Sequence, residues 1–173
     1  IEKLTAQKES DAKTWDIDVA VVHQKAGGEL VEKGLLAKYR QQINTGSMVS
    51  AENAKNALGV NVDGYVMPMF LSQTAIAWNS EAIKTPPASY DELVSWTQKN
   101  PQAFGYNGIK NGMSGVSFVV GWMYAYGTDA QRLSALPYDK GVEKNWSQAY
   151  EKLKAFNKNV TFTPGNAGTL DML

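Results

Sequence analysis

Residues 63–79, DGYVMPMFLSQTAIAWN, decide which fold the sequence favours. The stretch holds two apolar segments, and between them lies a small polar patch formed by Ser72, Gln73 and Thr74. Neither segment repeats its apolar residues at helical spacing, so both are predicted to be extended. Three uncharged hydrogen-bonding side chains therefore lie in the middle of an otherwise apolar connection.

On the N-terminal side, a strand followed by a helix is predicted. Asp18-Val-Ala-Val-Val22 is an apolar, mainly β-branched run between polar residues, which is typical of a strand covered on both faces in a parallel sheet. Residues 23–28 are then the loop at its carboxyl end, and residues 29–39 form a helix that Gly34 weakens. With a short helix at 1–9, this pattern predicts the first half of a βα unit.

On the C-terminal side, helices alternate with short strands. Thr85-Pro-Pro-Ala88 stops the preceding segment, and Ser89 with Glu92 forms a capping box that opens a helix. The pattern then predicts a strand at 104–109, a glycine-rich loop at 110–115, an apolar helix at 116–126, the longest amphipathic helix at 142–156, a strand at 160–163 and a helix that begins at 165–167. The predicted fold class is α/β.

The composition narrows the classes of function. Seventeen basic residues balance seventeen acidic ones, so the chain has no summed positive field to hold nucleic acid or an anionic membrane. No apolar run approaches the roughly 20 residues of a membrane-spanning helix, and no membrane insertion is expected. The absence of cysteine excludes disulfides and thiolate nucleophiles.

Enzymatic chemistry has few candidate groups. With one histidine, no Gly-x-Ser-x-Gly elbow and no phosphate loop, only carboxylates are left as acids or bases. Asp16 and Asp18 point the same way along the predicted strand, but they lie at its start, opposite the end where an α/β sheet holds its ligand. No acidic or histidine cluster has metal-ligand spacing, so neither a metal nor a cofactor is predicted.

Several motifs occur in a recognisable order. They are Asp16 to Val22 followed by Gly34-Leu-Leu36, then Gly64 to Asn79, Pro86 to Leu93, Ser114 to Gly127, and Gly168 to Leu173. This order resembles the family-one extracellular solute-binding proteins of ABC importers, a type II periplasmic binding protein group that includes maltose-binding protein. The resemblance spans nearly the whole chain, and it rests on the order of the motifs.

The resemblance implies a two-lobed type II architecture that this chain covers only in part. Residues 1–71 would be part of the first lobe, 72–79 the crossover or hinge, and 80–173 part of a mostly helical second lobe. The family's opening strand and C-terminal half have no counterpart here, so both ends are expected to be cut ends of a longer protein. The resemblance also implies a periplasmic protein whose leader is absent from this chain.

Ten residues are candidates for contact with a solute in the cleft between the lobes. Some follow the carboxyl end of the predicted strand, some face the inner side of the hinge, and some lie on a glycine-rich loop before a helix, where free amides bind anionic or hydroxyl-rich groups. An aromatic ring near a strand end could stack on a sugar. The ten candidates are His23, Gln24, Tyr65, Ser72, Gln73, Thr74, Asn111, Gly112, Met113 and Ser114.

Each candidate also has a structural interpretation. A lone histidine at a strand end is often a hydrogen-bonded loop residue, Ser72 to Thr74 could satisfy backbone groups at a bend, and a glycine-rich loop is often only a turn. Core packing is the expected role of four tryptophans, at positions 78, 96, 122 and 146.

The implied function is a receptor that binds a small solute and delivers it to the permease of an ABC importer. A sugar or polyol is favoured, because neutral hydrogen-bonding and aromatic residues outnumber charges among the candidates. The alternatives are a phosphorylated compound, an organic acid or a polyamine, with Lys25 and Lys110 available for anions. An interaction module derived from the same fold and an α/β hydrolase that uses carboxylates are further alternatives.

Overall fold

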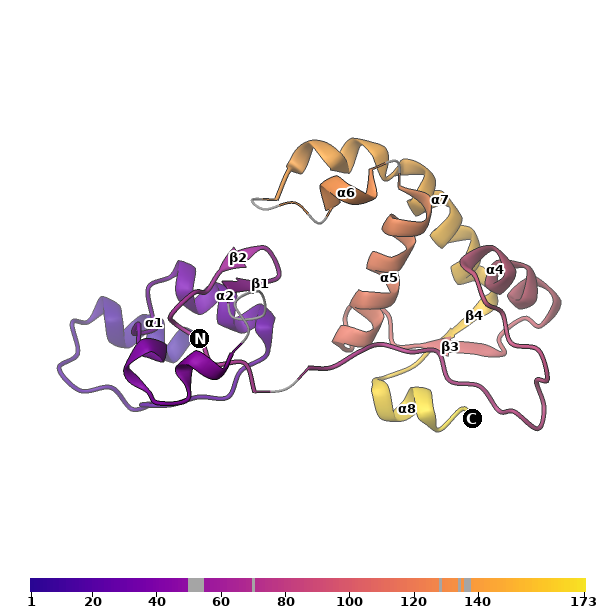
Figure 1. The fold of residues 1–173 in the computed structure, drawn as a ribbon. Helices are drawn as coiled ribbons and strands as arrows, with labels where there is room; N and C mark the ends of the chain where they lie inside the picture. The colour runs from indigo at the N-terminus through magenta and orange to yellow at the C-terminus, as the bar shows by residue number, and fades with distance from the viewer. Residues whose placement is uncertain (50–54, 70, 128, 134, 136–137) are drawn as a thin grey trace. The chain divides into compact units, whose positions relative to one another are not determined.

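The computed structural model describes residues 1–49, 55–69, 71–127, 129–133, 135 and 138–173, which form two compact units (Figure 1). The first unit is Ile1–Leu71 and the second is Ser72–Leu173. Their boundary falls inside the stretch 63–79, next to the polar patch. Each unit has a hydrophobic core of its own.

The first unit combines helices with one small hairpin. Its described elements are α1 Glu2–Glu9, α2 Gln24–Glu32, the 3-10 turns η1 Arg40–Gln42 and η2 Gly46–Met48, and strands β1 Asn56–Ala57 and β2 Val60–Asn61. β1 and β2 pair in antiparallel fashion, with Ala57 opposite Val60. Leu58 and Gly59 between them both have positive φ, as a tight two-residue hairpin turn requires.

The core of the first unit is small. It consists of Leu4, Leu30 and Leu35, with Leu36 packed against them. α2 lies close to the hairpin, because a Cβ at Gly28 would come within 3.2 Å of the carbonyl oxygen of Ala57.

α2 begins and ends earlier than the sequence pattern predicts. The helix begins at Gln24 because the imidazole Nδ1 of His23 accepts a hydrogen bond from the backbone N–H of Lys25 at 3.3 Å, as an N-cap side chain does. It ends at Glu32 and does not continue to Tyr39, because Gly34 adopts φ +63° just past its end. Residues 23–28 are therefore the cap and first turns of the helix, and the prediction that they form a loop is wrong.

The strand predicted at Asp18 to Val22 is absent from the structure. These residues form no helix or strand, and the side chains of Val19 and Val21 are 88% and 76% exposed. A strand requires a neighbour for its backbone groups, and none of the strands in the described part of this unit pairs with residues 18–22. The prediction of a strand covered on both faces at these residues is therefore wrong.

The second unit is mostly helical around one pair of parallel strands. Its described elements are α4 Tyr90–Lys99, β3 Phe104–Tyr106, α5 Met113–Tyr126, α6 Ala130–Leu133, η3 Lys140–Asn145, α7 Ser147–Phe156, η4 Asn157–Asn159, β4 Val160–Phe162 and α8 Asn166–Leu170. β3 and β4 run parallel, with Phe104 opposite Val160 and Tyr106 opposite Phe162. Both strands were predicted near these positions.

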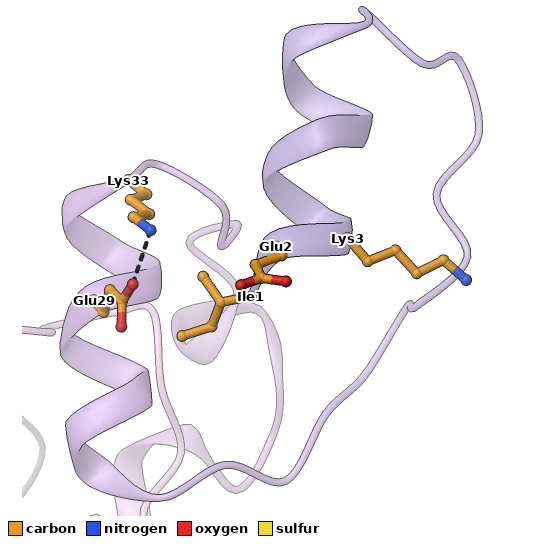
Figure 2. A pocket seen from close by; sticks show the side chains of 5 residues that line it. All are labelled: Ile1, Glu2, Lys3, Glu29 and Lys33. Atoms are coloured by element: carbon orange, nitrogen blue, oxygen red, sulfur yellow. Dashed lines mark ion pairs between the residues drawn. The ribbon is translucent and has the colours of Figure 1, made fainter.

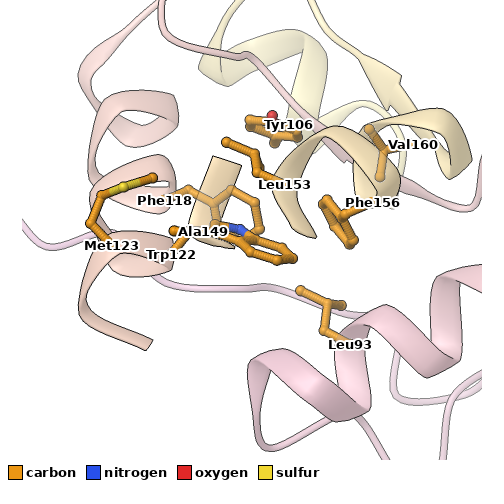
Figure 3. Packing of buried hydrophobic residues seen from close by; sticks show 9 residues of the cluster. All are labelled: Leu93, Tyr106, Phe118, Trp122, Met123, Ala149, Leu153, Phe156 and Val160. Carbon is orange, nitrogen blue, oxygen red and sulfur yellow. The ribbon is translucent and has the colours of Figure 1, made fainter. Parts of the chain in front are cut away.

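The core of the second unit is rich in aromatic side chains (Figure 3). It gathers residues from α4, α5, α7 and both strands: Leu93, Tyr106, Phe118, Trp122, Met123, Ala149, Leu153, Phe156 and Val160. Trp122 is fully buried, and its ring centroid lies 5.0 Å from that of Phe156 on α7. Aromatic side chains bury about 150–250 Å² each, so these rings contribute a large part of the apolar area that this core buries.

Two boundaries in this unit differ from the prediction. The segment predicted as one helix at 142–156 is divided into η3 and α7, so α5, with 14 residues, is longer. α5 begins at Met113, three residues before the predicted start. Of the tryptophans expected in the core, Trp122 is buried, whereas Trp78 remains 46% exposed.

Candidate functional site

The start of α5 packs tightly against the loop that follows β3. A Cβ at Gly115 would lie 1.7 Å from the carbonyl oxygen of Gly108, so only glycine allows this approach. Gly112 caps the helix with φ +150°, a value that side chains disfavour. The glycines of this loop are therefore required for the packing and the capping of the start of α5.

Three polar side chains bind one another at this helix start. Asn107, which is only 2% exposed, donates through Nδ2 to the side-chain oxygen of Asn166 at 2.9 Å and to the carbonyl of Asn111 at 3.3 Å. The hydroxyl of Ser114 lies 3.1 Å from Oδ1 of Asn107 and 2.6 Å from Oδ1 of Asn166. These bonds join the end of β3, the first turn of α5 and the first residue of α8.

The predicted loop residues are brought together here, but two of their side chains have internal partners. Ser114 belongs to the network, and Nδ2 of Asn111 donates to the carbonyl of Thr163 at 3.3 Å. Gly112 and Met113 complete the first turn, whose backbone N–H groups lack intrahelical acceptors.

A groove of about 500 Å³ lies beside the second turn of α5. Its lining comes from residues 73–76, from the start of α4 and the residues just before it, and from α5: Gln73, Thr74, Ala75, Ile76, Pro87, Ala88, Ser89, Tyr90, Leu93, Ser117 and Phe118. None of these side chains is charged. Gln73 and Thr74 are exposed and line the groove, whereas Ser72 is exposed and does not.

Tyr90 forms one wall of the groove, and its position depends on a glycine. Its hydroxyl donates a hydrogen bond to the carbonyl of Phe118 at 3.3 Å. A Cβ added at Gly121 would lie only 1.8 Å from the same hydroxyl oxygen, so a side chain at position 121 would clash with Tyr90. The ring packs edge-on against Trp122, with centroids 5.2 Å apart. Partial burial raises the pKa of Tyr90, so the phenol stays neutral over the physiological range.

Two charged groups near Tyr90, Asp91 and Lys152, are paired with each other. The hydroxyl of Tyr126 donates to Oδ1 of Asp91 at 2.7 Å, and Lys152 lies 3.7 Å from the same oxygen and 4.3 Å from the Tyr126 ring centroid. Burial, followed by the bond to Asp91 and its negative charge, raises the pKa of Tyr126 far above its usual range. These side chains are absent from the groove lining.

The remaining candidates belong to the first unit. His23 is exposed and caps α2, with Gln24 as the exposed first residue of that helix. Tyr65 is half-buried, and the ammonium of Lys38 lies 5.2 Å from its ring centroid. His23 therefore has the structural role that the sequence left open, and its contact with a solute stays a prediction.

A second pocket, of about 570 Å³, lies in the first unit (Figure 2). It is lined by Ile1, Glu2, Lys3, Glu29 and Lys33, and Lys33 forms an ion pair with Glu29 at 2.8 Å. The nearby carboxylate of Asp16 forms an ion pair with Lys3 at 2.7 Å, and this hydrogen bond lowers the pKa of Asp16.

Sequence reasoning missed the residues that shape the second unit's groove and network. They are Tyr90, Asn107, Ser117, Phe118, Gly121 and Asn166. Only Tyr90 carried a signal, since it follows the predicted cap Ser89. The others depend on contacts between segments far apart in the chain, such as Asn107 with Asn166, 59 positions on.

Comparison with known proteins gives one match. A family model described as bacterial extracellular solute-binding protein matches residues 1–173. No curated protein and no solved structure matches significantly. Within the described ranges, no helix is long and apolar enough to cross a membrane, and no group of three or more His, Cys, Asp or Glu side chains could hold a metal ion.

Proposed function

We propose a function from one premise: the chain belongs to the bacterial extracellular solute-binding proteins, whose family model matches it from residue 1 to residue 173. The resemblance found in the sequence is confirmed at the level of the family, and the α/β class agrees with the mixture of helices and strands. The function of this chain is accordingly to bind a small solute outside the cytoplasm.

The proposed receptor role includes a partner protein and a cellular location. The chain presents its solute to the permease of an ABC importer, and it does so in the periplasm. The family match supports both parts of this proposal.

The solute is a sugar or another polyol, and the uncharged lining of the groove carries this part of the proposal. A charged solute bound there would lose water without gaining a counter-ion, which is costly. A neutral polyol would find the amide of Gln73 and the hydroxyls of Thr74 and Ser117 for its polar groups, and the ring of Tyr90 for its apolar face. Ligand pockets span roughly 300–1,000 Å³, and the groove volume of about 500 Å³ suits a small molecule.

An anionic solute is the second candidate, and the start of α5 favours it. The first-turn amides offer positive potential within one helical turn of Ser117, and the exposed Lys110 lies three residues before the helix. If the carboxylate or phosphate of a solute bound at the first turn of α5, the uncharged part of the solute could occupy the groove.

Thermal unfolding with a panel of solutes tests the proposal. Neutral sugars and polyols, organic acids, phosphorylated compounds and polyamines are each added in excess, and turnover is measured in parallel. A solute at a hundredfold excess over its Kd stabilises the folded chain by about 2.7 kcal/mol, which raises Tm by roughly 5–11 °C for a chain of this size. Stabilisation by a sugar or polyol without turnover is expected, whereas turnover of any solute would contradict the receptor role.

A matched pair of variants then tests the groove. Gln73→Ala removes an exposed amide from the lining, whereas Gln148→Ala removes an exposed amide from α7, away from it. Loss of one hydrogen bond should weaken binding roughly two- to tenfold in the first variant only. Equal affinities in both variants would remove the groove from the binding site.

A further inference from the structure

Two Asn-Gly pairs lie four positions apart around the start of α5, in opposite environments. Asn107, before Gly108, is 2% exposed, and its side chain takes part in three hydrogen bonds, to Asn111, Asn166 and Ser114. Asn111, before Gly112, is exposed, and its side chain makes one hydrogen bond of 3.3 Å, to the carbonyl of Thr163. The same dipeptide is therefore fixed at one position and accessible at the other.

We propose that Asn111 is a site of spontaneous deamidation and that the fold protects Asn107 from the same reaction. The main-chain nitrogen of Gly112 loses its proton and attacks Cγ of Asn111. The new N–Cγ bond closes a succinimide ring, and the Cγ–Nδ2 bond breaks and releases ammonia. Water then opens the ring on either side and yields aspartate or isoaspartate, so the net change is amide plus water to carboxylic acid plus ammonia.

The local geometry explains why the two sites differ. Glycine after the asparagine leaves the attacking nitrogen without a neighbouring side chain in the way, which both pairs share. Ring closure also requires the side-chain amide to turn toward the following peptide, and for this Asn107 must break three hydrogen bonds whereas Asn111 must break one. Each additional bond lowers the population of the open state roughly two- to tenfold, so the two additional bonds of Asn107 should make Asn111 react about four- to a hundredfold faster.

The modification would change the start of α5. A carboxylate at position 111 cannot donate to the carbonyl of Thr163, so the bond that holds loop 110–112 to the residue after β4 is lost. An isoaspartate would also lengthen the main chain just before Gly112, which caps the helix with an unusual backbone conformation. The new negative charge would oppose an anion at the first-turn amides.

Peptide mapping of the intact chain tests the proposal. The protein is incubated at physiological temperature in mildly alkaline buffer, and samples taken over time are digested and analysed by mass spectrometry, with isoaspartate detected by enzymatic methylation. Products are expected at position 111 and not at position 107 in the folded chain. In concentrated urea, the two sites should react at similar rates, because only the fold distinguishes them.

Asn111→Gln is the control variant, because glutamine keeps the amide but closes its ring slowly. Product formation in the folded chain should fall to the level of the other amides in this variant. Equal rates at positions 107 and 111 in the folded chain would overturn the proposal, and so would an unreacted Asn111 in a folded chain that reacts there once unfolded.

Discussion

Replacing Gly121 with alanine is expected to destabilise the second unit, although alanine is the better helix former. The added Cβ would lie 1.8 Å from the hydroxyl oxygen of Tyr90 and 2.9 Å from its Cζ. The Tyr90 ring has little room to retreat, because its centroid lies 5.8 Å from that of Phe118 and 5.2 Å from that of Trp122. Tyr90 must therefore leave its position along α5, and the wall of the groove moves with it.

Three contributions determine how much Gly121→Ala changes the free energy of unfolding. Glycine to alanine inside a helix gains about 1 kcal/mol. Forcing a packed side chain out of position costs about 1–3 kcal/mol, and loss of the hydrogen bond from Tyr90 to Phe118 costs about 0.5–1.5 kcal/mol. The net expectation is a loss of about 1–3 kcal/mol in the free energy of unfolding.

Urea unfolding of four proteins measures this contribution: the original chain, Gly121→Ala, Tyr90→Ala and the double variant. Once Tyr90 is truncated, the clash is absent, so Gly121→Ala should stabilise the chain by about 1 kcal/mol. The coupling between the two positions is then about 2–4 kcal/mol. If Gly121→Ala stabilised the chain equally in both backgrounds, the described packing of Tyr90 on α5 would be refuted.

Three further predictions concern the core, a helix cap and pH. Phe156→Ala should lower the free energy of unfolding by about 3–5 kcal/mol in urea titrations, and an equal loss for the 57% exposed Phe162→Ala would contradict the assigned core. Ser89→Ala, which removes the acceptor for the N–H of Glu92, should cost about 1 kcal/mol by thermal unfolding, and no change would refute the cap. The raised pKa of Tyr126 means that the folded chain holds this proton more tightly, so its contribution is complete below the ordinary tyrosine pKa of about 10 and declines as pH rises above it. Tyr126→Phe should flatten stability curves measured above that pH, and an unchanged slope would count against the raised pKa.

Local signals in the sequence predicted much of the second unit. The Ser89 cap is confirmed: its hydroxyl accepts the N–H of Glu92 at 3.2 Å, and the Glu92 carboxylate in turn accepts the N–H of Ala88 at 2.8 Å. Strands β3 and β4 are also confirmed near the predicted residues. These features depend on residues close together in the chain, which a sequence pattern records directly.

Some of the errors arose where distant residues decide the outcome, and one arose from a local cap. The run from Asp18 to Val22 has strand propensity, but propensity does not supply a pairing partner. The predicted helix at 142–156 is interrupted because Asp139 accepts the N–H of Gly141 and opens a separate 3-10 segment before α7. For the candidate site, the pattern found the loop at 111–114 but not Asn107 and Asn166, whose bonds give that loop its structural role.

The parallel pairing of β3 with β4 has a consequence for folding kinetics. The chain between the two strands contains α5 and α7, and Gln102 beside β3 donates a hydrogen bond to the carbonyl of Lys158, 56 positions away. Closing so long a loop has an entropic cost that local helix contacts do not bear. The helices should therefore form on a faster timescale, and docking of the strand pair should be the slow event that completes the second unit.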